Sequence, residues 1–368
     1  MNVLITGARG FIGKNLISAL KETKKYNIIT FIKENDTISL ENKVKKADFI
    51  IHLAGVNRTE NRKLFWEVNN DLTKNICDIL RENSLKTPIL FSSSIQVQLN
   101  NEYGKTKLSA ENLLKELNES NNNPILIYRL PGIFGKWCKP NYNSVVATFC
   151  HNIANNLELK LIDEEKEIRL VYIDDLISNI SKNINSNNFG INYIEVNPKY
   201  NISISKLALT IKKFKESREN LLIEKIGFGF TKKLYATYLS YLPCEKFSYS
   251  LKKYADQRGD FVEILKTKES GQFSYFTAKP GISRGGHYHH TKCEKFLVVE
   301  GKAKFRFKNI INEELFEKIT SCENPEIIES IPGWSHEVTN ISNDKLIVLV
   351  WANEVFDKSN PDTFQRKL

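Results

Sequence analysis

The opening segment of the chain, MNVLITGARGFIGKNL, constrains the fold more than any other part of the sequence. An apolar run at residues 2–5 leads into a loop with glycines at three positions, after which a helical pattern begins at once. These glycines are Gly7, Gly10 and Gly13. The first permits a tight turn, the second lets backbone amides approach a pyrophosphate, and the third allows the helix to pack closely on the strand. Directly after a strand, such a triplet predicts a dinucleotide-binding site.

Strand-like and helix-like patterns alternate from residue 1 to about residue 130. The apolar, β-rich runs are residues 2–5, 28–32, 49–53, 89–91 and 125–128, and the segments with helical periodicity are 11–21, 72–82 and 109–117. This alternation predicts an α/β fold, a Rossmann-like doubly wound parallel sheet with helices on both faces. Residues 131–243 mix helical stretches, of which 205–215 is the clearest, with polar loops, as expected of a lobe that covers a substrate.

The character of the chain changes after Pro243. Strand-like segments separated by glycines then recur every eight to twelve residues, with almost no helical periodicity until the end. This pattern predicts an all-β sandwich or barrel. We therefore expect two domains, residues 1–244 and 245–368, with the substrate lobe mainly in residues 131–243.

The residues after the second predicted strand bear on the choice of cofactor. NAD-binding proteins usually carry an acidic residue about 20 positions past the glycine loop, where it meets the ribose hydroxyls. In this chain Lys33 comes first and Glu34 follows, and Arg9 lies inside the glycine loop itself. Because both cations could meet the 2′-phosphate, the sequence favours NADPH over NADH.

A serine at a strand end and a tyrosine–lysine pair follow the predicted cofactor loop. Ser94 comes just after the fourth β-rich run, and Tyr103 and Lys107 are four residues apart, so the pair shares one face of a helix. Lys107 can then lower the pKa of the tyrosine and orient the cofactor ribose, while the phenol donates a proton to a substrate oxygen. A tyrosine and a lysine four apart also occur at 249/253, 275/279 and 288/292, so the context of Tyr103 carries this prediction and its spacing does not.

These motifs, over roughly residues 1–240, resemble the extended short-chain dehydrogenase/reductase family, in the branch that acts on nucleotide sugars. The resemblance also includes residues 52–55 (HLAG), 129–131 (RLP), 134–135 (FG) and 171–175 (VYIDD). It implies hydride transfer to a sugar ketone, with Tyr103 as the acid, Lys107 as its partner and Ser94 holding the carbonyl. The implied cofactor contacts are Gly7, Arg9, Gly10, Phe11, Ile12, Gly13, Lys33, Leu53, Ala54, Gly55, Tyr103 and Lys107. His52, which has apolar neighbours, is expected to pack in the core.

Several of the six histidines lie in one short segment, GGHYHHTKCEKFLVVEG at residues 285–301. Alternate side chains of a strand share a face, so we expect His287 and His289 to point together and His290 to point away. Glu294 and, from a distant strand, His336 could complete a pocket of three imidazoles and one carboxylate. These donors suit zinc, and also iron, nickel, copper or manganese.

The spacing of this segment resembles the first motif of the cupin family. The matching residues are Gly281, His287, His289, Glu294 and Gly301. Residues 332–340 resemble the second motif, with His336 in the ligand position, although the residue usually found between proline and glycine is missing and Glu326 replaces an expected glycine. The resemblance implies a jelly-roll barrel with one divalent metal, expected to be zinc, and the implied ligands are His287, His289, Glu294 and His336. The alternative is a metal-free barrel whose histidines act as bases or only pack.

The presence of both parts in one chain narrows the resemblance. Nearly the whole chain, including residues 134–143, 238–243 and 289–299, resembles the bifunctional enzymes of the UDP-N-acetyl-L-fucosamine pathway, which supply a sugar for bacterial capsule or O-antigen. The resemblance implies that the cupin part epimerises C3 of a UDP-4-keto-6-deoxy-N-acetylhexosamine. The reductase part would then reduce C4 with NADPH, to UDP-2-acetamido-2,6-dideoxy-L-talose. A homodimer is expected from both families.

Two other functions fit the same residues. The barrel could be a structural or dimerising module of a reductase without epimerase activity. Alternatively, the chain could be a non-catalytic regulator that binds NADPH. A regulator needs the glycine loop but not Tyr103 and Lys107, so the presence of this pair in context favours an enzyme.

The composition argues against several other classes of protein. No apolar run approaches the roughly 18 residues of a membrane span and the chain begins directly with a strand, so we expect a cytoplasmic protein without membrane contact. The cysteines lack framework spacing, which suits reduced thiols. The net charge of +10 comes without an arginine-rich run or zinc-finger spacing, so we expect no nucleic-acid partner.

Overall fold

The computed structural model describes residues 1–32, 37–186, 189–251, 253–256, 259–262, 265–267, 271–354 and 359–368. The chain forms two compact units, residues 1–144 with 168–201 and residues 145–167 with 202–368. Residues 145–167 and 202–244, which the sequence places in the first domain, thus share a compact unit with the C-terminal β segment. The domain boundary at residues 244/245 stays a prediction.

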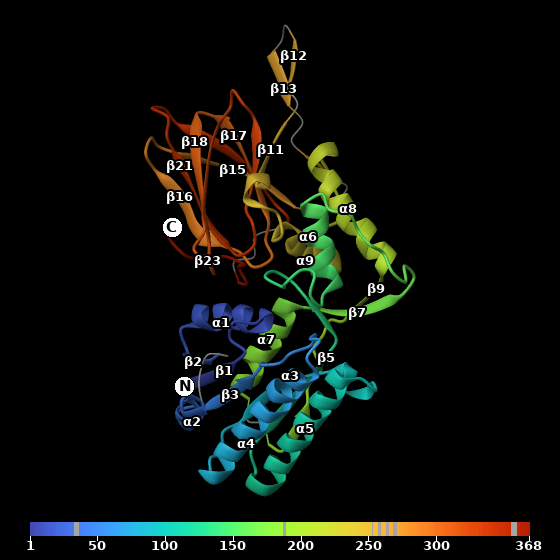
Figure 1. The fold of residues 1–368 in the computed structure, drawn as a ribbon. Coiled ribbons are helices and arrows are strands. Elements are labelled where there is room, and N and C mark those ends of the chain that lie inside the picture. Colours follow the sequence, from blue (N-terminus) through green and yellow to red (C-terminus); the bar gives the residue numbers. More distant parts are fainter. Residues whose placement is uncertain are drawn as a thin grey trace. The chain divides into compact units, whose positions relative to one another are not determined.

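A six-stranded parallel sheet with the order β2-β1-β3-β4-β5-β8 forms the centre of the first unit (Figure 1). Its strands are β1 (Asn2–Thr6), β2 (Asn27–Phe31), β3 (Phe49–His52), β4 (Ile89–Ser94), β5 (Ile125–Leu130) and β8 (Ile191–Tyr193). Strands β1, β3, β4 and β5 are buried almost throughout. Helices cover both faces of a parallel sheet, which explains why these strands have mainly apolar sequences before their carboxyl ends.

Helices cover both faces of this sheet. In Figure 1, α1 and α7 lie on one face, and α2, α4 and α5 lie on the other. The helices are α1 (Phe11–Thr23), α2 (Thr37–Lys45), α3 (Arg62–Trp66), α4 (Leu72–Glu82), α5 (Glu102–Asn121) and α7 (Ile173–Ile184). A π-helical turn (Glu67–Asp71) joins α3 to α4, and a 3-10 turn (Ile95–Gln98) precedes α5. The predicted doubly wound α/β fold is confirmed, and α4 has the predicted bounds.

The winding of the sheet reverses at β1, which has β2 on one side and β3 on the other. In such sheets, ligands bind outside the carboxyl ends of the strands beside the reversal. Residues 7–10 follow β1 and residues 53–55 follow β3, so both segments lie at this point. The topology therefore places the predicted cofactor loop where a ligand is expected.

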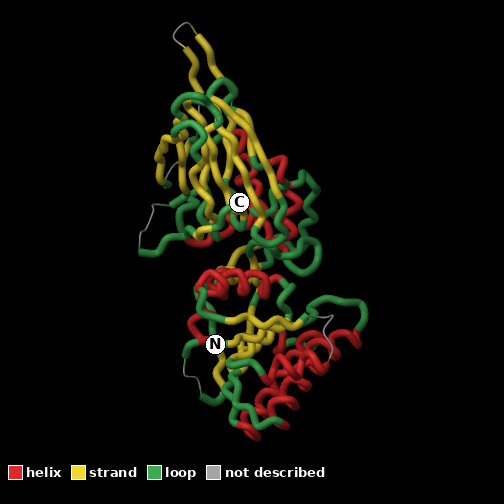
Figure 2. Tube along the Cα trace, turned by 90° about the vertical axis from the view of Figure 1, so that its left-hand side faces the viewer, coloured by secondary structure: helices red, strands yellow, loops and turns green. Residues whose placement is uncertain are grey.

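The second unit contains two antiparallel five-stranded sheets (Figure 2). The first has the order β11-β20-β17-β22-β15, with β11 (Ser248–Ser250), β15 (Gln272–Ala278), β17 (Glu294–Glu300), β20 (Glu326–Glu329) and β22 (Leu346–Ala352). The second has the order β19-β18-β21-β16-β23, with β16 (Ser283–Tyr288), β18 (Lys302–Asn309), β19 (Leu315–Ser321), β21 (Trp334–Asn340) and β23 (Phe364–Gln365). Alternate residues of β18, namely Ala303, Phe305 and Phe307, are buried. The predicted all-β domain of jelly-roll type is confirmed.

Helices α6 (Val145–Ala154), α8 (Ile204–Asn220) and α9 (Gly229–Leu239) belong to the same unit as these sheets. Phe214 of α8 packs against Tyr235 and Tyr238 of α9, with ring centroids 5.1 and 6.0 Å apart. The predicted helix at 205–215 lies within α8. Aromatic packing of this kind joins α8 to α9.

Buried charges connect α8 to the first of the two β-sheets. Arg218 of α8 forms an ion pair with Glu329 of β20, and Glu329 also pairs with Lys295 of β17. The guanidinium of Arg218 lies 4.5 Å from the ring centre of Tyr249, and the ammonium of Lys295 lies 3.1 Å from the hydroxyl of Tyr249. This network, together with the packing of Leu221 against Leu297 and Ile327, joins α8 and the residue after it to the β-sheets.

Short strands complete the fold. Strands β6 (Gly132–Phe134), β7 (Glu167–Tyr172) and β9 (Tyr200–Ser203) form a small sheet, β10 (Leu222–Ile223) pairs with β14 (Lys266–Thr267), and β12 (Lys253–Asp256) pairs with β13 (Gly259–Val262). A 3-10 turn (Cys244–Lys246) precedes β11.

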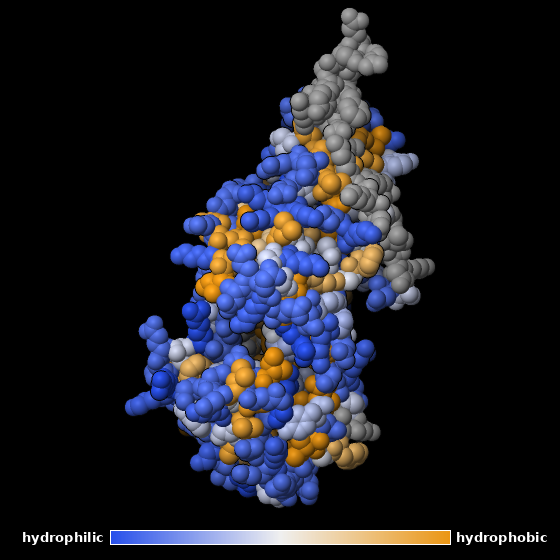
Figure 3. Space-filling view, turned by 90° about the vertical axis from the view of Figure 1, so that its right-hand side faces the viewer, coloured by the Kyte–Doolittle hydropathy of each residue, from blue (hydrophilic) through white to orange (hydrophobic). Residues whose placement is uncertain are grey.

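No helix among the described residues is long and apolar enough to cross a membrane. On the face shown in Figure 3, hydrophilic side chains predominate and hydrophobic ones form scattered patches, as is usual for a folded protein. The six cysteines are free thiols, as expected.

Candidate functional site

Gly7, Gly10 and Gly13 shape the turn between β1 and α1. Gly7 has a φ of +67°, and a Cβ atom there would stand 2.7 Å from the backbone nitrogen of Ala54. A Cβ atom on Gly13 would stand 2.4 Å from the carbonyl oxygen of Gly7. Gly10 is the N-cap residue of α1, where the absence of a side chain leaves the helix N-terminus accessible to an anion. The turn at Gly7 and the close packing at Gly13 have the predicted geometry, and the approach of a pyrophosphate at Gly10 stays a prediction.

Two cavities of about 590 Å³ lie at the carboxyl ends of the strands in the first unit. They share Gly7, Arg9, Gly10, Leu53 and Gly55, so they are adjoining parts of one cleft. The first has a mainly apolar lining that includes Phe31, Ile32, Val56, Leu64, Val68 and Leu72. The second contains Phe11, Ile12, Gly13, Ser94, Tyr103 and Lys107. An apolar slot beside a polar chamber suits a flat base at one end and reacting groups at the other.

The predicted cofactor contacts line these cavities with one exception. Ala54 lines the first cavity, and Arg9 is exposed and lines both. Lys33 lies outside the described residues. Of the two cations that could meet a 2′-phosphate, Arg9 is therefore the one that the structure places at the cleft.

Tyr103 and Ser94 are joined by a hydrogen bond in the second cavity. Ser94 ends β4, and Tyr103 lies in the first turn of α5, whose N-cap residue Asn101 accepts a hydrogen bond of 2.8 Å from the amide of Gly104. Burial raises the pKa of Tyr103, and the hydrogen bond from Ser94 lowers it by less. The phenol is therefore protonated at neutral pH, as a proton donor to a substrate oxygen must be.

Lys107 lies one turn later on α5 and is buried. Its ammonium donates a hydrogen bond of 2.8 Å to the carbonyl of Ser92, and a Cβ atom on Gly55 would stand 3.1 Å from its nitrogen. Burial lowers the pKa of Lys107 to about 7, against a smaller opposite effect of Glu111. The hydrogen bond from Ser94 is an influence on the pKa of Tyr103 that the sequence did not indicate. The predicted effect of Lys107 on this pKa stays a prediction.

The buried carboxylate of Glu111 lies beside this site, and no pattern in the sequence marks it as a functional residue. Glu111 of α5 accepts a hydrogen bond of 2.5 Å from the hydroxyl of Ser93 and bonds of 3.0 and 2.7 Å from Arg129. The guanidinium of Arg129 lies 4.7 Å from the ring centre of Tyr193. These contacts hold β4, β5 and α5 together beside Ser94. Arg129 stands in a family motif, but nothing marks Glu111 as its partner.

The segment after β6, residues 135–144, forms a wall of the second cavity. Arg58 donates a hydrogen bond of 2.6 Å to the carbonyl of Tyr142, and the hydroxyl of Tyr142 donates one of 3.0 Å to the carbonyl of Arg58. Trp137 lines the cavity with a φ of +68°, a conformation that costs energy for a residue with a side chain. The sequence marks this segment only as part of the resemblance and assigns it no role.

His52 lies in neither cavity. Its side chain is buried, and its two ring nitrogens share hydrogen bonds of 2.6 and 2.9 Å with the hydroxyls of Thr6 and Thr73. Burial lowers the pKa of His52 to about 3, with a smaller contribution from Lys107. It is a core residue, as predicted.

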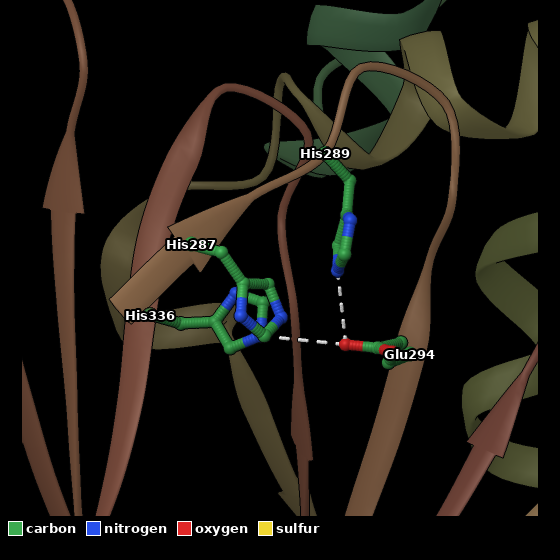
Figure 4. Close-up of side chains that lie close together, drawn as sticks. All are labelled: His287, His289, Glu294 and His336. Carbon is green, nitrogen blue, oxygen red and sulfur yellow. Dashed lines mark hydrogen bonds and ion pairs between the residues drawn. The ribbon is translucent and has the colours of Figure 1, made fainter. Parts of the chain in front are cut away.

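In the second unit, the side chains of His287, His289, Glu294 and His336 converge (Figure 4). One ligand atom from each lies within 4.8 Å of the others. Oε2 of Glu294 lies 3.1 Å from Nε2 of His289 and 3.3 Å from Nε2 of His336. His287 is on β16, His289 follows its end, Glu294 begins β17 and His336 is on β21. We call these residues the histidine cluster.

A β-bulge directs His287 into the histidine cluster. The pairing of β16 with β21 shifts register between Gly285 and His287, and after the shift His287 lies opposite His336. Gly285 has a φ of +113°. The extra residue of a bulge rotates the following side chains relative to the partner strand.

The charge states of the histidine cluster suit metal ligands. Burial, and the nearby rings of His336 and His289, lower the pKa of His287 to about 3, and burial also lowers the pKa of His336. Burial opposes the charge of Glu294, but His289 and His336 hold its pKa well below the usual range. At neutral pH, His287 and His336 are therefore neutral imidazoles and Glu294 is a carboxylate, the forms that bind metals.

The Nδ1 nitrogen of His289 is hydrogen-bonded to a residue near the end of the chain. Nδ1 donates a hydrogen bond of 2.5 Å to the carbonyl of Asp362, which leaves Nε2 facing Glu294. Histidines that bind metals usually make such a bond. Nδ1 of His336 is buried and lacks a hydrogen-bond partner within the described ranges, so protein groups do not fully satisfy the cluster. The donor set fits a divalent cation, with zinc, iron, nickel, copper and manganese as candidates.

His290 and Lys292 lie beside the histidine cluster. The ring of His290 packs against Phe364 and Tyr288, with centroids 4.9 and 5.5 Å apart, so it points away from the cluster as predicted. The ammonium of Lys292 lies 3.3 Å from Oε1 of Glu294.

Two protein families match separate parts of the chain. Residues 3–202 match the NAD dependent epimerase/dehydratase family, and residues 254–364 match the polysaccharide biosynthesis C-terminal domain.

Individual proteins resemble the chain over all or part of its length. UDP-2-acetamido-2,6-beta-L-arabino-hexul-4-ose reductase of Pseudomonas aeruginosa is 46% identical over 364 residues, which are 99% of this chain and 98% of the relative. The crystal structure of the capsular polysaccharide assembling protein CapF of Staphylococcus aureus is 42% identical, covers 100% of both chains and has a TM-score of 0.67. UDP-glucuronic acid 4-epimerase of Bacillus cereus, solved with NAD, covers 58% of this chain and 84% of its own at 20% identity and a TM-score of 0.53, which shows the fold alone.

Proposed function

Because the chain belongs to the NAD dependent epimerase/dehydratase family and resembles a UDP-sugar 4-ketoreductase over its whole length, we propose that it is a bifunctional enzyme of capsule or O-antigen sugar synthesis. Its β-barrel inverts C3 of a UDP-4-keto-6-deoxy-N-acetylhexosamine. Its reductase part then reduces C4, which yields UDP-2-acetamido-2,6-dideoxy-L-talose, the precursor of UDP-N-acetyl-L-fucosamine. The observation that carries the proposal is that Ser94, Tyr103 and Lys107 line the same cleft as the glycine loop.

Reduction of a ketone adds a hydride to carbon and a proton to oxygen. A nicotinamide held in the cleft would supply the hydride. Tyr103 would donate the proton, because burial keeps its phenol protonated at neutral pH. Ser94, which is hydrogen-bonded to Tyr103, holds the carbonyl oxygen of the sugar ketone. Lys107 is buried beside Gly55 and orients the cofactor ribose. A positioned proton donor contributes roughly 10²–10⁴-fold to such a rate.

The cofactor is NADPH in this proposal. Arg9 lies at the cleft, and a guanidinium is suited to bidentate contacts with a phosphate. The predicted contact of Lys33 with the 2′-phosphate would add a second positive charge.

Inversion at C3 removes a proton from one face of the sugar and returns a proton to the other. This proton is acidic only while C4 is a ketone, so epimerisation precedes reduction. A divalent cation held by the histidine cluster, with zinc as the expected ion, would supply positive charge beside the ketone oxygen, an effect of a few kcal/mol per good interaction. His290, Lys292 and a water molecule are the candidates that carry the proton. The proposal includes a cytoplasmic homodimer, as expected from both families.

Full-length variants can separate the two activities. With the 4-keto sugar nucleotide in D2O, Tyr103→Phe should still exchange the C3 proton for deuterium but should no longer oxidise NADPH. His336→Ala should lose the exchange at C3 and should still oxidise NADPH when given the sugar already inverted at C3. Deuterium entry is read by NMR and NADPH oxidation by absorbance.

Matched controls are Tyr26→Phe and His151→Ala, which change residues outside the cleft and the histidine cluster. Absence of deuterium at C3 in the unmodified protein would show that the barrel is a structural module. Normal NADPH oxidation by Tyr103→Phe would remove the catalytic assignment.

A further inference from the structure

The end of the chain lies against the histidine cluster. Strand β23 pairs with β16, so that Gln365 lies opposite His287 and Phe364 opposite Tyr288. The ring centroid of Phe364 is 5.6 Å from that of Tyr288. The strand that carries the first ligand therefore has the end of the chain as its neighbour on one side and β21 on the other.

Asp362 holds the turn between His289, which follows β16, and Glu294, which begins β17. Its carboxylate accepts hydrogen bonds of 2.8, 2.6 and 2.6 Å from the backbone amides of His290, Thr291 and Lys292. It also accepts a bond of 2.9 Å from the hydroxyl of Thr291. The carbonyl of the same residue accepts the bond from Nδ1 of His289. Asp362 therefore contacts each residue from His289 to Lys292.

Arg366 anchors the segment on its other side. Its amide donates a hydrogen bond of 2.8 Å to the carbonyl of Gly286, and its guanidinium donates one of 3.1 Å to the carbonyl of Ile310. Its carbonyl accepts a hydrogen bond from the hydroxyl of Ser335, which precedes the ligand His336. Residues 362–366 are thus fixed to both strands that carry the histidine ligands.

We propose that residues 362–366 form a strap that sets the geometry of the metal ligands, and that Asp362 is its positioning residue. The inference rests on the proposed function, in which the histidine cluster holds a divalent cation. The carbonyl of Asp362 selects the tautomer in which Nε2 of His289 faces the cation. Its carboxylate fixes the turn and so the separation of His289 from Glu294. Loss of contacts of this kind typically weakens metal binding about 10–100-fold.

The test compares Asp362→Ala and Asp362→Asn with the unmodified full-length protein. Lys367→Ala is the matched control, because it changes an exposed residue next to the strap. Each protein is stripped of metal with a chelator. Affinity for Zn²⁺ is then measured by competition with a chromogenic chelator, and Co²⁺ is added to record its visible absorption spectrum, which reports ligand geometry.

We expect binding about 10–100-fold weaker and an altered Co²⁺ spectrum for Asp362→Ala. Asp362→Asn, which keeps one acceptor oxygen, should show a smaller loss, and Lys367→Ala should match the unmodified protein. If Asp362→Ala does not fold, Asp362→Asn decides the question, with equal unfolding temperatures of the metal-free proteins as the check on folding. Unchanged affinity and spectrum in the variant that folds would overturn the role of the strap. Failure of the unmodified protein to bind either ion would instead contradict the proposed function.

Discussion

His287 and His336 lie directly opposite each other on β16 and β21, with ring centroids 4.8 Å apart. This relationship depends on the bulge at Gly285, because a shift of one residue in a β-ladder moves side chains to the other face. A feature of the backbone therefore decides whether two of the proposed ligands meet.

Gly285→Ala should disturb this relationship. A Cβ atom at Gly285 would stand 2.7 Å from the carbonyl oxygen of His336, and the residue has a φ of +113°. We expect a loss of about 1–3 kcal/mol in the free energy of unfolding, measured with urea on metal-free protein, and weaker metal binding. Gly281→Ala is the control, since Gly281 has a φ of +74° but open space around its Cβ position. Equal stability of the two variants would show that the contact with His336 does not matter.

Lys107→Met should change the dependence of stability on pH. Burial lowers the pKa of Lys107 from 10.5 to about 7, so between these values the unfolded chain binds a proton that the folded chain has released. The free energy of unfolding therefore rises with pH between pH 7 and pH 10.5, by up to about 1.4 kcal/mol per pH unit. It falls again as the pH is lowered to 7. Urea unfolding at pH 7 and pH 9 should show the unmodified protein gaining stability relative to Lys107→Met.

The exposed Lys105, on the same helix, provides the control for that experiment. Lys105→Met should follow the pH dependence of the unmodified protein. Parallel curves for Lys107→Met and the unmodified protein would mean that Lys107 stays charged in the fold.

Glu329→Gln should destabilise the second unit. Glu329 is buried between Arg218 and Lys295, and its neutralisation leaves the guanidinium of Arg218 without its counter-charge. Removal of one partner from a buried ion pair costs about 3–5 kcal/mol. Limited proteolysis and urea unfolding measure the effect, and Glu323→Gln, at an exposed residue of the same unit, is the control. By the same reasoning, a fragment of residues 245–368 lacks Arg218 and should be cleaved faster than a fragment of residues 202–368.

Arg9→Ala should change the cofactor preference. We expect kcat/KM for NADPH to fall about tenfold or more, equivalent to roughly 1.4 kcal/mol or more, with little change for NADH. Arg62→Ala, at an exposed arginine, is the control. An equal fall for both cofactors would indicate that Arg9 contacts the pyrophosphate that they share.

Local patterns of sequence were sufficient for much of the fold. The buried parallel strands and α4 were predicted because continuous apolar runs and helical periodicity reflect their immediate surroundings. The grouping of α8 with the β-barrel could not be predicted in this way. It involves contacts such as the ion pair of Arg218 with Glu329, which are 111 residues apart, and a pairing over that separation leaves no periodic signal.

The sequence by itself determined the glycine loop, the pair Tyr103 and Lys107, and the residue types of the histidine cluster, because each depends on short spacings within one element or motif. Only the tertiary structure decided how these groups are directed. The bond from Ser94 to Tyr103, the bulge at Gly285 and the contacts of Asp362 with the turn at 289–292 all join segments that are separate in sequence or depend on backbone geometry. The directions and the protonation states of these side chains depend on burial and on contacts with other segments. Burial and such contacts exist only in the folded chain.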